Sequence, residues 1–132
     1  MKIIDKLAWI YVQDKKILST LSIWKDIWYI PWWKREWNES DQQALVREIE
    51  EELTVKLDPE LMEHYWTFEA QAHWKDKGII VKMTCYIASH IWEFQASSEI
   101  QEWKFLEYKD REISSEVDKL IFDDLHTKWL II

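Results

Sequence analysis

The chain has 132 residues, a length that predicts one domain (residues 1–132) able to bury a core without disulfides. Its formal net charge of −8 argues against binding to a nucleic-acid polymer, which requires clustered lysine and arginine, but does not exclude a phosphorylated small molecule carried in with a metal. It holds one glycine and eleven tryptophans, an unusual balance because glycine supplies the left-handed backbone that turns need.

The sequence gives no sign of a membrane or secretory protein. No apolar run approaches the roughly 20 residues of a membrane span. The first residues, MKIIDKLAWIYV, lack the cleavable small-residue site of a secretory signal. The single cysteine, Cys85, lies in an apolar, strand-like run and is expected to be a buried, inert thiol. We expect a cytoplasmic protein without a membrane partner.

Strands and helices are predicted to alternate along the chain. The strand-like segments are expected at residues 6–13, 16–21, 27–30, 64–72, 79–89 and 102–108. Asp14-Lys15 and Lys75–Gly78 are predicted turns, and residues 32–39 a loop. Strands mixed with two amphipathic helices predict an α/β fold built as a layered sandwich.

The first helix is predicted over residues 41–53. Ser40 followed three residues later by Gln43 has the form of a capping box. An apolar stripe recurs every four residues at Leu45, Ile49 and Leu53, and Pro59 rules out much further helix. A second helix is predicted over about residues 114–127 from apolar residues at helical spacing.

The first helix carries an unusual cluster of carboxylates. Residues 47–52 read R-E-I-E-E-E, with Glu39 eight residues before Arg47. Glu48, Glu51 and Glu52 are related by i, i+3 and i+4 and therefore share one helix face. Like charges this close repel one another unless a cation lies between them, so the spacing indicates a divalent metal site. Glu50 lies on another face and is read as solvated.

Residues 33–55 resemble the 23-residue box of the Nudix hydrolases, G-x5-E-x7-R-E-U-x-E-E-x-G-U, in which U is bulky and apolar. The box positions that match are Glu39, Arg47, Glu48, Ile49, Glu51, Glu52 and Val55. The box also follows a strand and a loop, as in the family, and IWYIPWWKRE resembles the family's strand that ends in Pro-Gly-Gly. The resemblance implies a Nudix-type α/β/α sandwich with a mixed β-sheet and two main helices.

The resemblance also implies an activity, which is hydrolysis of a nucleoside diphosphate linked to another group with Mg²⁺ or Mn²⁺. Hard oxygen ligands suit both ions. Glu51 and Glu52 would be the principal metal ligands and Glu48 would complete the site, with a backbone carbonyl of Trp32 or Trp33 as a further ligand. The substrate within the nucleotide class stays open; the small MutT-type members of the family act on oxidised nucleoside triphosphates.

Two further roles follow from the resemblance. Arg47 would orient a box glutamate through a charge-assisted hydrogen bond, with Glu39 as its expected partner. A glutamate beyond the box commonly serves as the catalytic base. Glu102, just before a strand-like run, is the first candidate for that role and Glu99 is the second. Taken singly, each of these two residues fits an exposed surface position better than a catalytic one.

The departures from the family pattern are systematic, because tryptophan stands at most positions where the family has glycine. The two box glycines are Trp33 and Thr54, and the preceding glycine is Trp32. Further tryptophans at glycine-like or turn-like positions are Trp24, Trp37, Trp66, Trp74 and Trp92. Each non-glycine residue in a left-handed conformation costs about 1–2 kcal/mol, so the chain is expected to be strained.

The tryptophans leave an alternative open. The chain could be a catalytically silent Nudix-like domain, either a binding module or an engineered glycine-to-tryptophan variant. The carboxylates favour the enzyme, whereas the lost glycines favour the silent domain. The tryptophans could also form an aromatic ligand-binding surface, but their scattered positions fit glycine replacement better. Oligomeric state also stays open, a homodimer included, because exposed tryptophan promotes association.

Overall fold

The structure is a computed structural model that describes residues 2–36, 38–71 and 78–132. Trp37, Trp74 and residues 75–77 of the predicted turn lie outside the described residues. The strands are β1 (Lys2–Ile10), β2 (Val12–Gln13), β3 (Lys16–Ser22), β4 (Trp32–Lys34), β5 (Lys56–Leu57), β6 (Glu63–Gln71), β7 (Ile79–Ile87), β8 (His90–Ile91) and β9 (Ile100–Leu106). The helices are α1 (Asp41–Leu53) and α2 (Glu116–Thr127), with two 3-10 helices, η1 (Pro59–Leu61) and η2 (Tyr108–Ile113).

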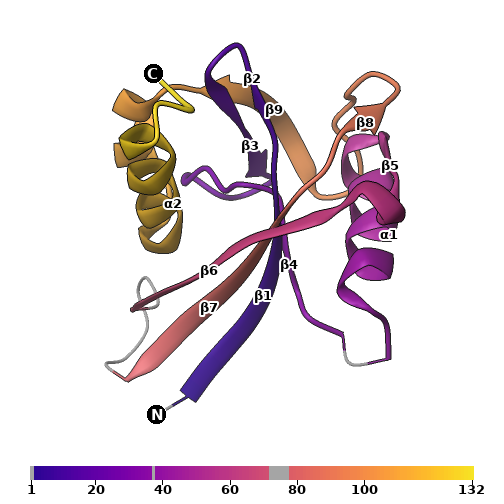
Figure 1. The fold of residues 1–132 in the computed structure, drawn as a ribbon, viewed down its shortest axis with the longest axis horizontal. Helices are drawn as coiled ribbons and strands as arrows, with labels where there is room; N and C mark the ends of the chain where they lie inside the picture. Colours follow the sequence, from indigo (N-terminus) through magenta and orange to yellow (C-terminus); the bar gives the residue numbers. More distant parts are fainter. Residues whose placement is uncertain (1, 37, 72–77) are drawn as a thin grey trace.

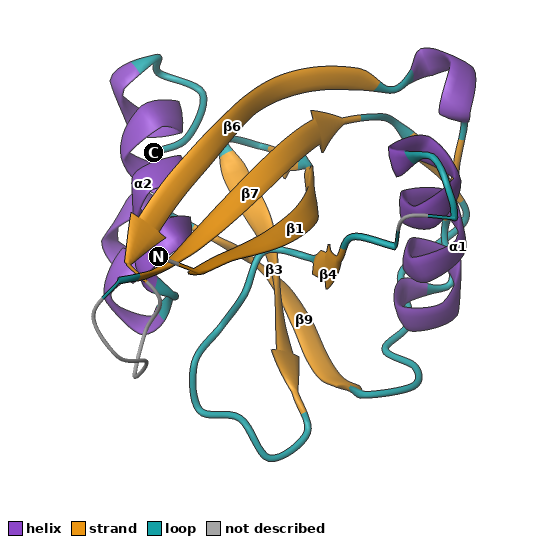
Figure 2. Ribbon diagram, turned by 90° about the horizontal axis from the view of Figure 1, so that it is seen from below, coloured by secondary structure: helices purple, strands orange, loops and turns teal. Residues whose placement is uncertain are grey.

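The strands form a mixed sheet and two smaller sheets between the helices. The largest sheet has the order β4-β1-β7-β6, in which β1 and β7 run parallel and the other pairs run antiparallel. A second sheet has the order β2-β3-β9, and β5 pairs with β8. Helices α1 and α2 lie on opposite sides of the strands (Figures 1 and 2). The expected α/β/α sandwich with a mixed sheet is therefore confirmed.

Both helices begin and end where local sequence signals place them. Ser40 Oγ accepts from the Gln43 amide at 3.1 Å, and Gln43 Oε1 accepts from the Ser40 amide at 3.0 Å, which completes the predicted capping box. Helix α1 ends at Leu53 because Thr54 takes a left-handed conformation with φ 59°. Helix α2 begins at Glu116, two residues later than predicted, after Ser115 as its N-cap.

The strand predictions succeed where two strands pair locally. The hairpin between β2 and β3 turns at Asp14 and Lys15, whose φ angles of 52° and 59° are those of a type I′ turn. The predicted strand over residues 6–13, however, breaks at Tyr11, because β1 and β2 belong to different sheets.

Two local predictions are wrong. Residues 27–30 form no strand, because only isolated bridges join Trp28 to Ser114 and Tyr29 to Thr20. The predicted loop over residues 32–39 opens with strand β4, which pairs with β1 from Trp32 to Lys34. In both cases pairing with a distant strand decides the structure, and the local pattern carries no signal of that pairing.

The apolar core divides into two clusters, one on each side of the main sheet. One cluster lies under α1 and contains Leu45, Ile49 and Leu53 of the predicted stripe. The other lies under α2 and contains the apolar side chains of Val117, Ile121 and Leu125. Cys85 is buried in this second cluster, and burial raises the pKa of its thiol, as expected of an inert cysteine. Within the described residues, neither helix is long and apolar enough to cross a bilayer.

Several non-glycine residues adopt the left-handed backbone that glycine normally provides. Trp24 has φ 69°, Trp92 has φ 75° and Trp129 has φ 62°. Trp24 and Trp92 are among the tryptophans that the sequence marks as turn-like. Trp32 and Trp33, in contrast, lie in extended strand β4 with no positive φ, so the expected backbone strain is absent there.

Replacing Trp24 with glycine is expected to stabilise the protein. Trp24 is 95% exposed and left-handed, so the change relieves strain without removing packing. We expect the free energy of unfolding to rise by about 0.5–1 kcal/mol in guanidinium titrations followed by circular dichroism. Trp66→Gly is the matched control, because Trp66 is 60% exposed in β6 without a positive φ and should lose about 0.5–1 kcal/mol. Equal effects at the two positions would contradict the strain argument.

Asp118 is a fully buried carboxyl group at the base of α2. Its Oδ2 accepts from the Ile30 amide at 2.8 Å, and its Oδ1 has no hydrogen-bond partner among the described residues. Burial raises the pKa of Asp118 to about 7, against the opposing effects of the Ile30 amide, Ser115 and Lys6. The folded state therefore keeps a proton on this group at pH values where the unfolded chain has released it.

This proton should make stability fall as pH rises from about 4 to about 7. The unfolded carboxyl loses its proton near pH 4 and the folded one near pH 7, so each step upward in this window favours unfolding. Asp118→Asn keeps an oxygen for the Ile30 amide and cannot titrate. We expect the free energy of unfolding of the variant, relative to the parent chain, to rise by a few kcal/mol across this window in urea titrations. A pH-independent difference would contradict the assignment.

Candidate active site on helix α1

Arg47 lies on the solvent side of α1 and contacts three carboxylates of the motif. Its Nε and Nη2 donate to the two oxygens of Glu39 at 3.0 and 2.7 Å, and Nη1 donates to Glu48 Oε1 at 2.7 Å. Glu51 Oε1 lies 3.7 Å from Nη1. The Arg47 guanidinium holds the pKa of Glu39 below its usual range. The carboxylates of Glu39 and Glu48 in turn raise the pKa of Arg47. The Arg47–Glu39 pair expected from the sequence is present.

Glu52 makes none of these ion pairs with Arg47 and lines a pocket. It is half-buried, and no positively charged side chain contributes to its pKa. Burial is the main cause that raises the pKa of Glu52 to about 7, and the nearby charges of Glu48, Glu99 and Glu51 contribute to the same shift. The indole N–H of Trp33 favours the charged form but completes no hydrogen bond of good geometry. Glu52 is therefore a carboxylate whose charge the protein leaves uncompensated.

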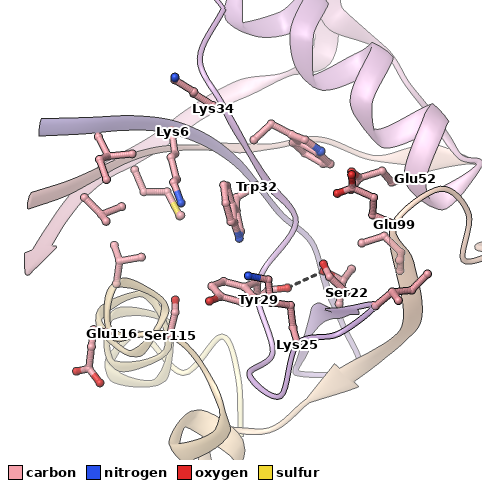
Figure 3. A pocket seen from close by; sticks show the side chains of 18 of the residues that line it. Lys6, Ser22, Lys25, Tyr29, Trp32, Lys34, Glu52, Glu99, Ser115 and Glu116 are labelled. Atoms are coloured by element: carbon pink, nitrogen blue, oxygen red, sulfur yellow. Dashed lines mark hydrogen bonds between the residues drawn. The ribbon is translucent and has the colours of Figure 1, made fainter. Parts of the chain in front are cut away.

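The loop before β9 brings a second carboxylate to Glu52. The amides of Gln95 and Ser97 donate to the carbonyls of Leu53 and Glu52, each at 3.0 Å. These bonds satisfy two of the carbonyls that the end of a helix leaves free. They also fix the path of the loop, which carries Glu99 to the side of Glu52 (Figure 3).

Glu52 and Glu99 lie at one end of a pocket of about 670 Å³. The pocket continues past Trp32 and Tyr29 to Lys6 and the start of α2 (Figure 3). Its lining combines apolar side chains with both signs of charge, as is typical of a ligand site. Its volume is sufficient for a nucleotide-sized molecule.

Some of the site residues predicted from the sequence line this pocket, and others lie outside it. Glu52, Glu99, Trp32 and Trp33 line the pocket. Glu102, the first candidate base, lies opposite Leu21 in the β3–β9 pair, is exposed, and is not among the lining residues. The second candidate, Glu99, is thus the one that the structure places beside a box glutamate.

The start of α1 is fixed to the sheet by a polar cluster that sequence reasoning missed. Asp41 pairs with Arg35 and accepts from the Tyr86 hydroxyl at 2.6 Å. Arg35 also lies 3.3 Å from Asp5 and donates to Thr84 at 3.2 Å. The Arg35 side chain is 17% exposed, so these contacts form in a partly desolvated place where charge pairs are strong. They hold the helix that carries the box glutamates at a fixed position on the sheet.

Within residues 2–36, 38–71 and 78–132, no three His, Cys, Asp or Glu side chains are grouped closely enough to hold a metal ion. Arg47 contacts two of the predicted ligands, Glu48 and Glu51, whereas Glu52 faces the pocket. The chemistry of the donors nevertheless suits Mg²⁺ or Mn²⁺, because both ions prefer oxygen ligands and Glu52 has other carboxylates near it. The residues therefore fit a divalent cation by chemistry, with Arg47 competing for two of them.

Other pocket residues carried no sequence signal. Lys6 comes from β1, and its Nζ lies 3.2 Å from the centroid of the Trp32 ring. Lys25 and Tyr29 come from the irregular segment between β3 and β4. The local sequence around each of these three residues predicts only a strand or a turn. Only the pairing of β4 with β1 would have placed Lys6 and Trp32 together.

Comparison with solved structures shows the fold class. The ORF135 protein of E. coli is 24% identical, with a TM-score of 0.73 over 96% of this chain and 91% of that one. A MutT Nudix hydrolase from Burkholderia pseudomallei is 20% identical, with a TM-score of 0.67 over 83% and 87% of the two chains.

A third similar structure belongs to a longer protein. It is a bifunctional NMN adenylyltransferase/ADP-ribose pyrophosphatase from Francisella tularensis, in complex with AMP and a Mn ion. It is 16% identical, with a TM-score of 0.66 over 95% of this chain and 41% of that one. No sequence model of a protein family matches the chain, and no curated protein sequence matches it significantly. The chain has the fold of the Nudix hydrolases, and the resemblance of residues 33–55 to that family is confirmed by the fold.

Proposed function

We propose that this chain is a metal-dependent pyrophosphohydrolase that cleaves a nucleoside diphosphate linked to another group. The observation that carries the proposal is the position of the box glutamates. Glu52 faces a nucleotide-sized pocket with its charge uncompensated, next to Glu99 from a different loop. A purely structural acidic helix would instead direct its carboxylates to solvent or to cations.

Glu48, Glu51 and Glu52 would hold the cation, together with a backbone carbonyl of Trp32 or Trp33. A bound Mg²⁺ or Mn²⁺ supplies positive charge that neutralises the diphosphate and acidifies a water molecule. The Francisella tularensis protein of the same fold, in complex with AMP and a Mn ion, supports both the nucleotide class and the metal. Arg47 keeps Glu39 and Glu48 oriented at the rim of the site.

Glu99 would take the proton from the attacking water. It lies in the pocket beside Glu52, and its loop is tied to the end of α1 by two backbone hydrogen bonds. A general base must reach the proton that it abstracts, and geometry decides first between candidates. Glu102 points from an exposed position in β9, so we assign the role to Glu99 in preference to Glu102.

One observation favours a catalytically silent binding module instead. The side chains of Trp32 and Trp33 both occupy the pocket lining where the family resemblance places glycine. A screen for magnesium-dependent release of nucleoside monophosphates from nucleoside triphosphates, nucleotide sugars and dinucleoside polyphosphates separates the two functions. Absence of turnover for every substrate, with Mn²⁺ bound to the protein, would establish the silent module.

Glu52→Gln is expected to remove the activity. The neutral amide removes one carboxylate from the cation site, so kcat/KM should fall by at least about 100-fold and Mn²⁺ affinity should fall with it. Turnover is measured by release of the nucleoside monophosphate, and Mn²⁺ binding by electron paramagnetic resonance. Glu50→Gln is the matched control, because Glu50 lies on the same helix but pairs with Lys56 at 3.4 Å on the surface. Activity that survives in Glu52→Gln would refute the site.

Glu99→Gln and Glu102→Gln test the assignment of the base. Loss of a general base typically costs 10²–10⁴-fold in rate, so kcat of Glu99→Gln should fall by about that factor. Glu102→Gln changes an exposed side chain outside the pocket and should leave kcat within about twofold. The measurement is the initial rate at saturating substrate and Mg²⁺. The reverse outcome would restore Glu102 as the base.

A further inference from the structure

The pocket lies at one edge of the main sheet, where Trp32 and Trp33 of β4 line it. Strand β4 is the edge strand, and side chains of a strand alternate between its two faces. Trp33 packs against the core cluster under α1, and Trp32 packs against the cluster under α2. The pocket accordingly has a carboxylate end beside α1 and a second end beside α2.

The second end is an apolar chamber with a polar rim. Its walls come from β1, β7 and the start of α2, through Ile4, Val81, Met83 and Val117. Lys6, Ser115 and Glu116 line the same end (Figure 3). This chamber is separate from the carboxylates that would hold the cation, so it would receive the part of a substrate that lies beyond the phosphates.

Trp32 lies between the two ends. In Figure 3 its indole stands between Lys6 on one side and Glu52 and Glu99 on the other. The Lys6 ammonium lies over one ring face at 3.2 Å from the centroid, and Tyr29 meets the indole edge-on with ring centroids 5.7 Å apart. Both contacts oppose rotation of the indole out of the pocket.

We infer that Trp32 is a specificity-determining residue that limits the size of the base in a nucleotide substrate. The inference rests on the proposed function. A nucleotide whose diphosphate lies at Glu52 must pass its sugar and base beside Trp32 to reach the chamber. The indole narrows this passage, so the chain favours a pyrimidine over the larger purine. Lys6 and Tyr29 act through Trp32 by holding its ring in place.

The test compares binding of two non-hydrolysable nucleotides, α,β-methylene UTP and α,β-methylene GTP, in the presence of Mg²⁺. Isothermal titration calorimetry on the full chain gives the two dissociation constants, and release of UMP from UTP and of GMP from GTP, measured by chromatography, gives the matching kcat/KM values. In Trp32→Ala we expect the preference for the uridine analogue to shift toward the guanosine analogue by at least about tenfold. Trp32→Phe keeps a ring under Lys6 and should shift the ratio by less. Trp66→Ala changes a tryptophan on β6 that does not line the pocket and should leave the ratio unchanged.

The outcomes separate this inference from the proposed function. An unchanged binding ratio in Trp32→Ala, with folding verified by circular dichroism, would overturn the inference. A shifted binding ratio together with absence of turnover of every substrate in the screen described above would uphold the inference and overturn the proposed hydrolase. Failure of the parent chain and of Trp32→Ala to bind either analogue would overturn the inference without bearing on the proposed function.

Discussion

The backbone hydrogen bonds between the end of helix α1 and the loop before β9 are the constraint on which the candidate site depends. Carbonyls at a helix end need partners, and the amides of Gln95 and Ser97 provide them. The same two bonds bring Glu99 to Glu52, so one local requirement of the helix also assembles a pair of carboxylates. Thr54 adds to the connection, since its left-handed backbone ends α1 and its hydroxyl donates to the Glu93 carbonyl at 3.3 Å.

The parts of the fold set by short-range signals could be predicted from the sequence. Helix α1 begins and ends at the predicted residues because its capping box and apolar stripe are local. The Arg47–Glu39 pair could be predicted as well, because both residues belong to one motif on a helix and its preceding loop. Strand β4 could not, since it exists only through pairing with β1. The choice between Glu99 and Glu102 depends on how a distant loop docks on α1, which no local pattern encodes.

Similarity of fold extends further than similarity of sequence in this chain. Sequence comparison weighs residue identity, and no family model matches, whereas Trp32, Trp33 and Thr54 stand where the resemblance implies glycine. Fold depends instead on strand pairing and on the apolar faces. The backbone is left-handed at Trp24 and Trp92, at a cost of about 1–2 kcal/mol each. Structural similarity therefore persists at 24% identity and below.

A cation neutralises some carboxylates of the motif on α1 but not others, and this difference relates the fold to the proposed chemistry. Arg47 neutralises the outer carboxylates, Glu39 and Glu48, with short hydrogen bonds. Glu52, one turn beyond Glu48, receives no such partner, and burial together with its acidic neighbours raises its pKa to about 7. A fold selected only for stability would pair this group or leave it in solvent. At an unpaired, half-buried carboxylate in the wall of a pocket, the cation of the proposed function would instead relieve the repulsion between acidic neighbours, and this relief would contribute to its binding energy.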